Sequence, residues 1–420
     1  MNRVVITGLG CITPIGNTVA EFTTSLFAGT SGIAPFTTLF PEPPTGDPGL
    51  RFKHMAEVKG FDPYAHMTSG AVVATERSAQ LGVVAARQAA LEAALRDHHA
   101  PENTAIVLGC STGGRHAEEP ETKKLYTTNG RVHPLTVPRS MASSGASQIA
   151  IDLGITGPTL NISTACASST HAIGLAFQMV RSGLVTAALT GGHEAPLTFG
   201  FLRAWDSMRV VSPTGCRPFS ADRDGMTLGE GAAILILESL ASAKARNATI
   251  YAEILGFGMS SDAHHITQPK PEGATAAIHA CFRDAARTLQ ETDQPGNAQS
   301  LMEEVGYINA HGTGTVVNDQ VESAAIHAVF GARAPHIPVS STKSLHGHSI
   351  GASGAIEAVA TALALHRGQL PATATTQTVD PTLNLDLILN APRPTGPTVA
   401  ISNSLAFGGL NAVIALRTFA

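Results

Sequence analysis

A cysteine at position 166 stands where a short predicted strand gives way to a predicted helix. Residues 161–174 begin with β-type residues, continue with Ala, Ser and Thr, and lead into an apolar run that ends near Arg181. The first turn of a helix offers unpaired backbone N–H groups and the positive end of the helix dipole, and both stabilise a thiolate. We therefore expect a lowered pKa for the Cys166 thiol and a nucleophilic role. A buried cysteine that packs as a small apolar residue remains the alternative on this stretch alone.

Three stretches of the second half combine reactive side chains with glycine, and each follows a predicted strand. They are residues 309–315 with His311, residues 341–348 with Lys343, and the glycine-rich residues 402–411. Each also has an ordinary explanation. A loop histidine is more often solvated than catalytic, a lysine is usually on the surface, and a glycine loop can be only a tight turn.

Taken together, these stretches favour acyl transfer. Cys166, His311, His348 and the glycine loop all fall at the same end of the predicted strands. A nucleophile, groups that handle protons or donate hydrogen bonds, and backbone oxyanion donors are what acyl transfer requires. Two other polar clusters do not suggest chemistry. The pair His264 and His265 has no further ligand at metal spacing, and Asp222-Arg223-Asp224 predicts a salt-bridge network, so we expect no metal site.

The elements expected around these residues repeat. In the first half, a strand at 159–163, the helix that begins at Cys166, a strand at 186–190 and a strand at 232–237 follow one another. The second half repeats this order with strands at 337–341, 398–402 and 412–417 and a helix from Gly351. Alternating strands and helices predict mostly parallel sheets covered on both faces. We therefore divide the chain into residues 1–249, which carry Cys166, and residues 250–420, which carry the other stretches. A long helix is expected at 72–97.

Composition narrows the possible functions. The 420 residues are 43% hydrophobic and 14% charged, a profile typical of a compact α/β enzyme. The net charge of −5 argues against nucleic-acid binding. The five scattered cysteines show no zinc or disulfide spacing. No run of about 18 apolar residues predicts a membrane span, and the N-terminus lacks the apolar core of a signal peptide. We expect a cytoplasmic protein.

Four motifs, in this order, resemble those of the β-ketoacyl-acyl-carrier-protein synthases, above all the elongating (synthase I/II) class of the thiolase superfamily. They are Thr-Ala-Cys-Ala-Ser-Ser at 164–169, His-Gly-Thr-Gly-Thr at 311–315, Lys343 followed five residues later by His348, and residues 403–411. The resemblance covers essentially the whole chain. It implies the thiolase fold, a duplicated five-layer α/β/α/β/α arrangement, usually in an intimate dimer.

The resemblance also implies a reaction. Cys166 would take an acyl chain from the phosphopantetheine of an acyl-carrier protein. His311 and His348 would then bind the thioester carbonyl of malonyl-carrier protein and stabilise the enolate formed as CO2 leaves. The enolate would attack the acyl group on Cys166, giving a β-ketoacyl product two carbons longer. No cofactor of the enzyme's own is implied, because the carrier protein brings the phosphopantetheine.

Further roles follow from the resemblance alone. Lys343 would orient the two histidines with Glu322 as its partner, and Phe407 would supply an oxyanion N–H and act as a gate. Thr313 and Thr315 would hold the pantetheine arm. The positions that match residues surrounding the reacting groups are Asp319, Glu322, Glu357 and Asn403.

Departures from the family pattern concern the acyl pocket and the carrier protein. His346 replaces a Thr and would bring a third histidine near the site. Thr112 stands where a bulky aliphatic residue often closes the acyl pocket, and Trp205 stands where a Phe is common. The last loop differs at Leu405, Ala406 and Leu410, and residues 70–77 hold few basic side chains. Residues 202–211 resemble synthases of specialised pathways, such as aryl-polyene or type II polyketide clusters.

Other members of the fold family fit less well. A thiolase needs a second cysteine in the last loop, but none follows Cys281, and the chain-initiating class has Asn in place of His348. A chain-length-factor subunit, which pairs with an active synthase, lacks the nucleophile. A scaffold or acyl-binding protein without turnover is a further alternative. The partner could be a second copy of this chain or a chain-length factor.

Overall fold

The computed structural model describes residues 1–36, 40–42 and 49–419. The Pro- and Gly-rich stretch 41–49, which the sequence predicts to be a loop, lies largely outside these ranges. The fold is built on one sheet of eleven strands in the order β12-β10-β9-β14-β15-β8-β1-β7-β6-β4-β5.

The sheet consists of two copies of one five-stranded unit. The first contains β1 (Val4–Ile12), β4 (Thr104–Gly109), β5 (Thr159–Ile162), β6 (Ala187–Glu194) and β7 (Gly231–Ser239). The second contains β8 (Ala252–Ser261), β9 (Val305–Asn309), β10 (Pro338–Ser340), β14 (Val399–Ala406) and β15 (Leu410–Arg417), with β12 (Asp386–Leu387) at its edge. The spatial orders β5-β4-β6-β7-β1 and β10-β9-β14-β15-β8 match strand for strand, and antiparallel pairing of β1 with β8 joins them. The predicted repeat is therefore confirmed.

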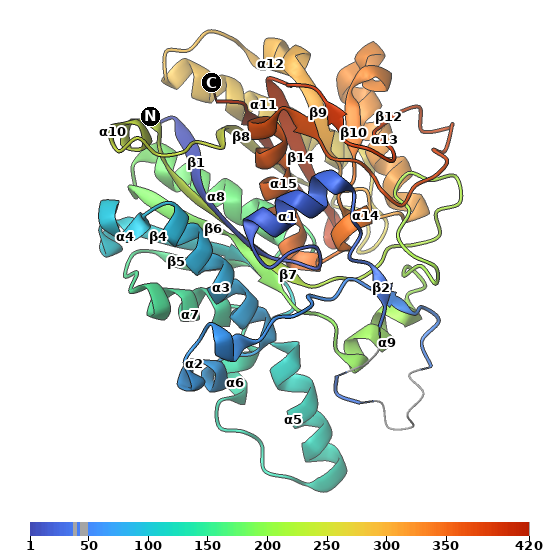
Figure 1. Ribbon diagram of the computed structural model, residues 1–420. Coiled ribbons are helices and arrows are strands. Elements are labelled where there is room, and N and C mark those ends of the chain that lie inside the picture. Colours follow the sequence, from blue (N-terminus) through green and yellow to red (C-terminus); the bar gives the residue numbers. More distant parts are fainter. Residues whose placement is uncertain (37–39, 43–48, 420) are drawn as a thin grey trace.

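Helices lie in three layers between and outside the two units (Figure 1). The middle layer holds α8 (Ser168–Ser182) and α15 (Ser353–Arg367). The outer layers hold α3 (Arg77–Glu92) with α7 (Ser144–Leu153), and α11 (Pro271–Glu291) with α13 (Val316–Phe330). This is the five-layer α/β/α/β/α thiolase fold that the resemblance implies.

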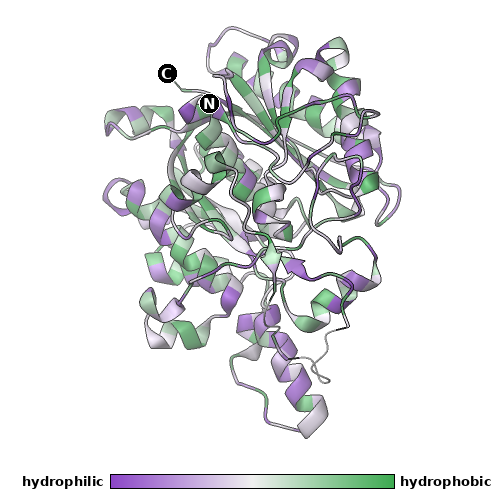
Figure 2. Ribbon diagram, turned by 45° about the vertical axis from the view of Figure 1, so that its right-hand side comes forward, coloured by the Kyte–Doolittle hydropathy of each residue, from purple (hydrophilic) through white to green (hydrophobic). Residues whose placement is uncertain are grey.

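Alternation along the strands explains the layers. On β4, Ala105 and Val107 belong to the central core with α8 and α15, whereas Ile106 and Leu108 belong to the outer core with α3 and α7. Successive side chains of a strand point to opposite faces, so an unbroken apolar strand is buried on both sides. Figure 2 shows hydrophobic residues along the inner strands and hydrophilic residues on the outer helices.

The prediction of one continuous helix at 72–97 is wrong, because the structure breaks this segment into three helices. The segment forms α2 (Ser69–Ala74), α3 and α4 (Leu95–His98). Thr75 is extended, and the Glu76 side chain caps α3 by accepting from the N–H of Ala79. At the other end Ala94 takes a left-handed conformation, with φ of 46°. The apolar periodicity continues across both breaks, so it did not reveal them.

The remaining elements connect these layers. The helices are α1 (Val19–Ala28), α5 (Arg115–Thr128), α6 (Thr136–Ser140), α9 (Phe199–Ser207), α10 (Leu240–Ala245), α12 (Ala298–Glu304) and α14 (Lys343–His346), and the short strands are β2 (Ala34–Pro35), β3 (His54–Met55), β11 (Gln369–Leu370) and β13 (Arg393–Pro394). Helix α5 projects from the body of the molecule (Figure 1). The boundary proposed after residue 249 falls between α10 and β8. In the described ranges, none of the helices has the length and apolar character to cross a membrane.

The duplicated topology brings four chain segments to one place. Cys166 follows β5, His311 follows β9, Lys343 follows β10 and Phe407 follows β14. The strands β9, β10 and β14 are parallel neighbours, so their carboxyl ends share one edge of the second unit. Ligands bind at the carboxyl ends of strands in α/β sheets. The loops that carry His311, Lys343 and Phe407 therefore lie together at this edge, and the 3.1 Å contact between His348 and Cys166 places the end of β5 beside them.

Candidate active site

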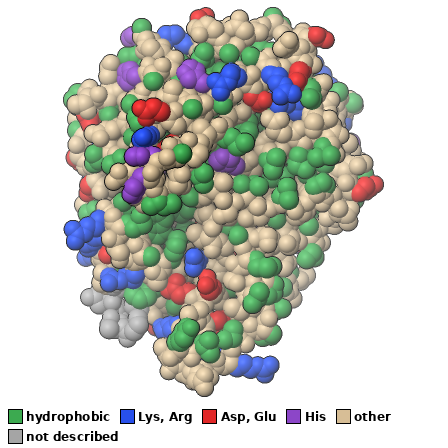
Figure 3. Space-filling model, turned by 180° about the vertical axis from the view of Figure 1, so that it is seen from behind, with side chains coloured by type: hydrophobic (Ala, Val, Ile, Leu, Met, Phe, Trp, Pro, Cys, Tyr) green, Lys and Arg blue, Asp and Glu red, His purple; other side chains and the backbone are tan. Residues whose placement is uncertain are grey.

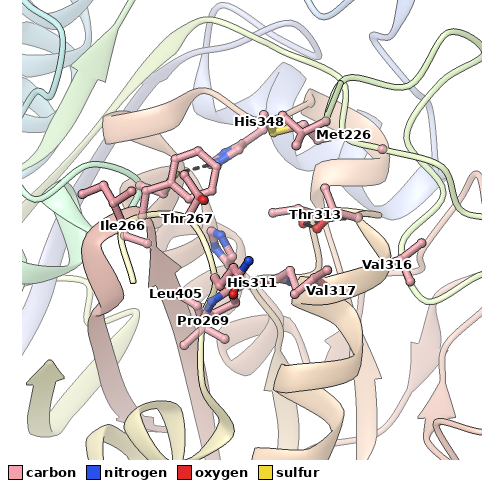
Figure 4. Close-up of a pocket in the computed structure, with 18 of the residues that line it drawn as sticks. Met226, Ile266, Thr267, Pro269, His311, Thr313, Val316, Val317, His348 and Leu405 are labelled. Atoms are coloured by element: carbon pink, nitrogen blue, oxygen red, sulfur yellow. Dashed lines mark hydrogen bonds between the residues drawn. The ribbon is translucent and has the colours of Figure 1, made fainter. Parts of the chain in front are cut away.

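A pocket of about 280 Å³ opens at this edge. On the face seen in Figure 3, histidine side chains lie beside a hollow lined with hydrophobic side chains. In Figure 4, His348 and Met226 lie at one end of the pocket, with Thr313, Val316 and Val317 on one wall and Ile266 and Thr267 on the other. The lining also includes Cys166, Trp205, His265, Pro269, His311, Leu405 and Phe407.

Cys166 sits in a strained turn just before α8. The residue in front of it, Ala165, has φ of 49°, a left-handed conformation that non-glycine residues adopt only when their surroundings enforce it. The turn leaves the residue Cys166 6% exposed at the wall of the pocket. The backbone N–H groups of Phe407 and of Cys166 itself are placed to hydrogen-bond to its sulfur.

The thiol pKa does not follow the prediction of a lowered value. Burial raises the pKa of Cys166 to about 12, and the charge of Lys343 and the N–H groups of Phe407 and Cys166 offset that effect only in part. The sequence argument considered the helix start but not the depth of the site. At this depth the cysteine is therefore a thiol that must give up its proton as it reacts.

His348 is the immediate proton partner of that thiol. Its Nε2 lies 3.1 Å from the sulfur of Cys166, and its Nδ1 lies 2.8 Å from the hydroxyl of Ser353. The ring of His311 stands nearly perpendicular to that of His348, with 5.4 Å between the ring centres. Burial and the nearby Lys343 charge hold the pKa of both histidines well below the usual range. Both imidazoles are therefore neutral at pH 7.

Lys343 fixes the tautomer of His311. Its ammonium lies 3.2 Å from Nδ1 of His311 and donates a 2.7 Å hydrogen bond to the carbonyl of the same residue. An ammonium has no acceptor, so Nδ1 must be the acceptor and the ring proton must be on Nε2. His311 therefore keeps a hydrogen-bond donor available on Nε2.

The carboxylate that pairs with Lys343 is Glu357, not Glu322 as expected. Lys343 and Glu357 are both fully buried and their charged groups are in direct contact. Burial raises the pKa of Glu357 to about 7, and the Lys343 charge acts against this shift. Glu357 lies on the central helix α15, so the lysine reaches across from α14 to the middle layer. Sequence distance offered no reason to prefer one acid over the other.

Glu322 instead holds the loop that carries His311. Its carboxylate accepts the N–H groups of His311 and Gly312, each at 2.8 Å, and the amide of Asn403 at 3.1 Å. Asp319 does the same for neighbouring turns: it accepts from the N–H of Phe219 at 2.7 Å and of Gly314 at 3.3 Å. Burial raises the pKa of Asp319 to about 7. These acids position backbone rather than touch the pocket.

The hydroxyls of Thr313 and Thr315 lie 2.9 Å apart on the wall of the pocket. Elsewhere in the lining, the Trp205 ring stacks on Phe407, with ring centres 5.9 Å apart and planes 24° apart. The pocket therefore combines a pair of hydroxyls with an aromatic stack. This combination suits a ligand with a polar arm and an apolar chain.

Thr112, expected in the acyl pocket, and His346, expected near the site, do not line this pocket. Thr112 is absent from the pocket lining, and its hydroxyl donates a 2.6 Å hydrogen bond to the buried carboxylate of Glu194. His346 is fully buried behind the site. One of its ring nitrogens pairs with the carbonyl of Gly347 and the other with the hydroxyl of Thr342. The third histidine is therefore a structural tie within the segment that carries Lys343 and His348.

The Asp222-Arg223-Asp224 stretch forms the salt bridges that its sequence predicts. Arg223 pairs with Asp380 at 2.7 Å, and Arg217 pairs with Asp222 at 3.2 Å and Asp224 at 3.0 Å. Within the described part of the chain, Cys166, His311 and His348 are the one group of three side chains with metal-ligating atoms within 4.8 Å of one another. Of the pair His264 and His265, His265 lines the pocket.

Several residues at the site were missed at the level of the sequence because their types do not indicate a functional role. Ser353 contacts the inner nitrogen of His348 from a run of Gly, Ala and Ser at the start of α15. Ile266, Thr267 and Pro269 form a pocket wall but belong to an irregular stretch after β8. Only the folded chain reveals which side of such a stretch faces the cysteine.

Comparisons with known proteins agree with this geometry. The chain matches the family models "Beta-ketoacyl synthase, N-terminal domain" over residues 1–243 and "Beta-ketoacyl synthase, C-terminal domain" over residues 251–377. It is 39% identical to Nodulation protein E of Rhizobium sp. (strain N33) over 99% of both chains. It is 40% identical to 3-oxoacyl-[acyl-carrier-protein] synthase 2 of Staphylococcus aureus (strain COL), over 99% of this chain and 98% of that one.

The fold is also similar to that of solved structures. A structure described as the ishigamide ketosynthase/chain length factor superposes with a TM-score of 0.91 at 35% identity, with both chains fully covered. Matches of this identity and coverage extend over every strand and loop that forms the pocket. The chain is therefore a member of the β-ketoacyl synthase family.

Proposed function

We propose that the chain condenses an acyl group held on Cys166 with malonyl-acyl-carrier protein, releasing CO2 and giving a β-ketoacyl-carrier protein two carbons longer. The observation that carries the proposal is the grouping of one thiol and two neutral imidazoles at the end of a pocket whose backbone N–H groups face the sulfur. Membership of the β-ketoacyl synthase family supports the same reaction.

In the first half-reaction the thiol attacks the thioester of an acyl-carrier protein. A bond forms between the Cys166 sulfur and the acyl carbon, and the bond from that carbon to the pantetheine sulfur breaks. The thiol proton passes to Nε2 of His348, 3.1 Å away, and from there to the departing pantetheine sulfur. The N–H groups of Cys166 and Phe407 stabilise the oxyanion, a contribution of about 3 kcal/mol per donor.

In the second half-reaction the malonyl thioester carbonyl lies between the two histidines. Loss of CO2 leaves the electron pair on the enolate oxygen, where the Nε2–H groups of His311 and His348 stabilise the charge. The enolate carbon attacks the acyl carbon and expels the Cys166 thiolate, which regains a proton from solvent. Lys343 keeps His311 in the donor tautomer throughout.

The surrounding residues bind and orient the substrate. Thr313 and Thr315 line the pocket where the pantetheine arm would run. Phe407 would gate the acyl side by rotation of its ring, and this rotation would break the stack on Trp205. Asp319, Glu322, Glu357 and Asn403 would act through the loops and the lysine that they hold.

The proposed partners are an acyl-carrier protein and a second synthase-like subunit. The name of the S. aureus relative includes the carrier protein, and that of the ishigamide protein includes a chain-length factor. Either a homodimer or a heterodimer with such a factor fits. We also propose a reducing compartment, the cytoplasm, because the five cysteines are all free thiols. No cofactor of the enzyme's own is proposed. Fatty-acid and specialised polyketide synthesis would use the same reaction.

A subunit without turnover, of the chain-length-factor or scaffold type, is the alternative. It would have no need for the Cys166 and His348 contact or for the buried Lys343 charge beside His311. A buried ion pair such as Lys343 with Glu357 often stabilises a fold no better than apolar residues would, so a buried lysine that also contacts Nδ1 of His311 favours a role in turnover.

Intact-protein mass spectrometry after mixing with an acyl-acyl-carrier protein tests the proposal. The wild type should gain one acyl mass. Cys166→Ala should gain none, whereas Cys281→Ala, which removes a buried cysteine of α11, should be acylated like the wild type. An adduct that persists in Cys166→Ala would contradict the assigned nucleophile.

A further inference from the structure

Ser353 is the first residue of α15 and contacts His348 on the side of the ring that faces away from Cys166. Its hydroxyl lies 2.8 Å from Nδ1 of His348, on the opposite side of the ring from the Cys166 sulfur. Ser353 and His348 are 0% and 1% exposed. A chain of three side chains therefore runs from the thiol through the imidazole to a buried hydroxyl.

The two histidines differ in what stands behind them. Behind His311 is the ammonium of Lys343, which can only donate, so the tautomer of His311 cannot change. Behind His348 is a hydroxyl, which can donate or accept by rotating about one bond. His348 therefore has both tautomers open to it, each with a hydrogen bond at Nδ1.

The two half-reactions need different tautomers of His348. To take the thiol proton, Nε2 must be bare and Nδ1 must carry the hydrogen, which it then donates to Ser353. To stabilise the enolate, Nε2 must carry the hydrogen and Nδ1 must accept from the Ser353 hydroxyl. A carbonyl behind the ring would support only the first arrangement, and an ammonium only the second.

We propose that Ser353 is a positioning residue that lets His348 alternate between proton acceptor and hydrogen-bond donor during one turnover. The proposal rests on the proposed function. In acyl transfer, the Cys166 proton moves to Nε2 and then to the leaving pantetheine sulfur, while Ser353 accepts from Nδ1–H. After acylation the sulfur carries no proton. The ring then adopts the Nε2–H form by exchange with solvent protons, and the Ser353 hydroxyl turns to donate to Nδ1.

Rates of the separate half-reactions test the role. Ser353→Ala should slow both the acylation of Cys166 and the release of CO2 from malonyl-carrier protein by about five- to tenfold, the effect of one lost neutral hydrogen bond. It should act on kcat with little change in KM. Ser353→Thr, which keeps the hydroxyl, should restore at least half of the wild-type rate.

The neighbouring Ser349 provides a matched control. It is fully buried in the same turn, and its hydroxyl has no hydrogen-bond partner among the described residues. Ser349→Ala should therefore leave both rates within twofold of the wild type. Equal losses in Ser349→Ala and Ser353→Ala would overturn the proposal, because they would reflect packing of the turn. Wild-type rates in Ser353→Ala, or a loss confined to one half-reaction, would overturn it too.

Nitrogen-15 spectra of labelled histidine read the tautomer without any turnover. With a free thiol, the His348 signals, assigned by their loss in His348→Ala, should report hydrogen on Nδ1. After Cys166 is capped with iodoacetamide they should report hydrogen on Nε2. In Ser353→Ala the first state should no longer be favoured. An unchanged tautomer on capping overturns the proposal, whereas absent acylation by wild type would overturn the proposed function alone.

Discussion

The buried ammonium of Lys343 offers the sharpest prediction. Lys343→Met keeps the length and apolar volume of the side chain but removes the charge that contacts His311, both its ring nitrogen and its carbonyl. Without this donor, Nδ1 of His311 can take the ring proton, and Nε2 then loses the hydrogen that would stabilise the enolate. Decarboxylation should suffer most. Acyl transfer uses His348 and should slow less, because it loses only the Lys343 charge that partly offsets the raised pKa of Cys166.

The magnitude follows from the kind of hydrogen bond that is lost. A hydrogen bond from a charged donor contributes about 1.5–3 kcal/mol, and each 1.36 kcal/mol in a barrier is a factor of ten. Lys343→Met should therefore release CO2 about 10- to 150-fold more slowly. Glu357 would lose its partner, but a carboxyl whose pKa is raised to about 7 can take up a proton and remain buried as a neutral group. The variant should still fold.

The assay is release of labelled CO2 from carboxyl-labelled malonyl-carrier protein, measured beside the rate of Cys166 acylation. Lys124→Met on the exposed surface of α5 is the control and should match the wild type. A Lys343→Met enzyme that releases CO2 within twofold of the wild type would refute the tautomer argument. An equal loss in acylation would show that the lysine supports the whole site rather than His311.

Three further predictions concern the thiol, the third histidine and the aromatic wall. Burial raises the pKa of Cys166 to about 12, so its alkylation by iodoacetamide should accelerate with every pH unit through pH 9. Peptide mass spectrometry measures this rate, and a plateau below pH 8 would contradict the neutral thiol. His346→Ala leaves the Thr342 hydroxyl and the Gly347 carbonyl unpaired, each at a cost of about 1–3 kcal/mol, so thermal unfolding should shift several degrees lower, and an unchanged midpoint would refute the structural tie. Trp205→Ala should cost about 3–5 kcal/mol of stability and should broaden the acyl-chain preference measured on a panel of acyl-carrier proteins. Trp205→Phe keeps the stack on Phe407 and should have neither effect. Equal behaviour of the two variants would argue against the stack.

The sequence revealed most of the architecture because its pattern is duplicated. The repeat of strand, helix, strand and glycine loop predicts the two matching units, and the motifs around Cys166, His311, Lys343 and His348 fall at strand ends that the fold brings together. Local signals of this kind survive in the linear chain, because strand ends and glycine turns depend on near neighbours.

What the sequence could not give depends on depth and on contacts across layers. The choice of Glu357 over Glu322 as the partner of Lys343 is set by the approach of α14 to the central helix. The raised pKa of Cys166 comes from burial that no local motif encodes. The resemblance implies Thr112 in the acyl pocket and His346 near the site, but their hydrogen bonds join them to Glu194 and to Thr342.

Condensation itself is the most direct test of the account. Wild-type enzyme loaded with an acyl group and mixed with malonyl-carrier protein labelled with carbon-13 at the methylene carbon should yield a labelled β-ketoacyl-carrier protein two carbons longer, with one CO2 released per product. Cys166→Ala should yield none of this product. CO2 release by the wild type without any elongated product, or elongation by Cys166→Ala, would contradict the central claim that Cys166 holds the chain that the enolate attacks.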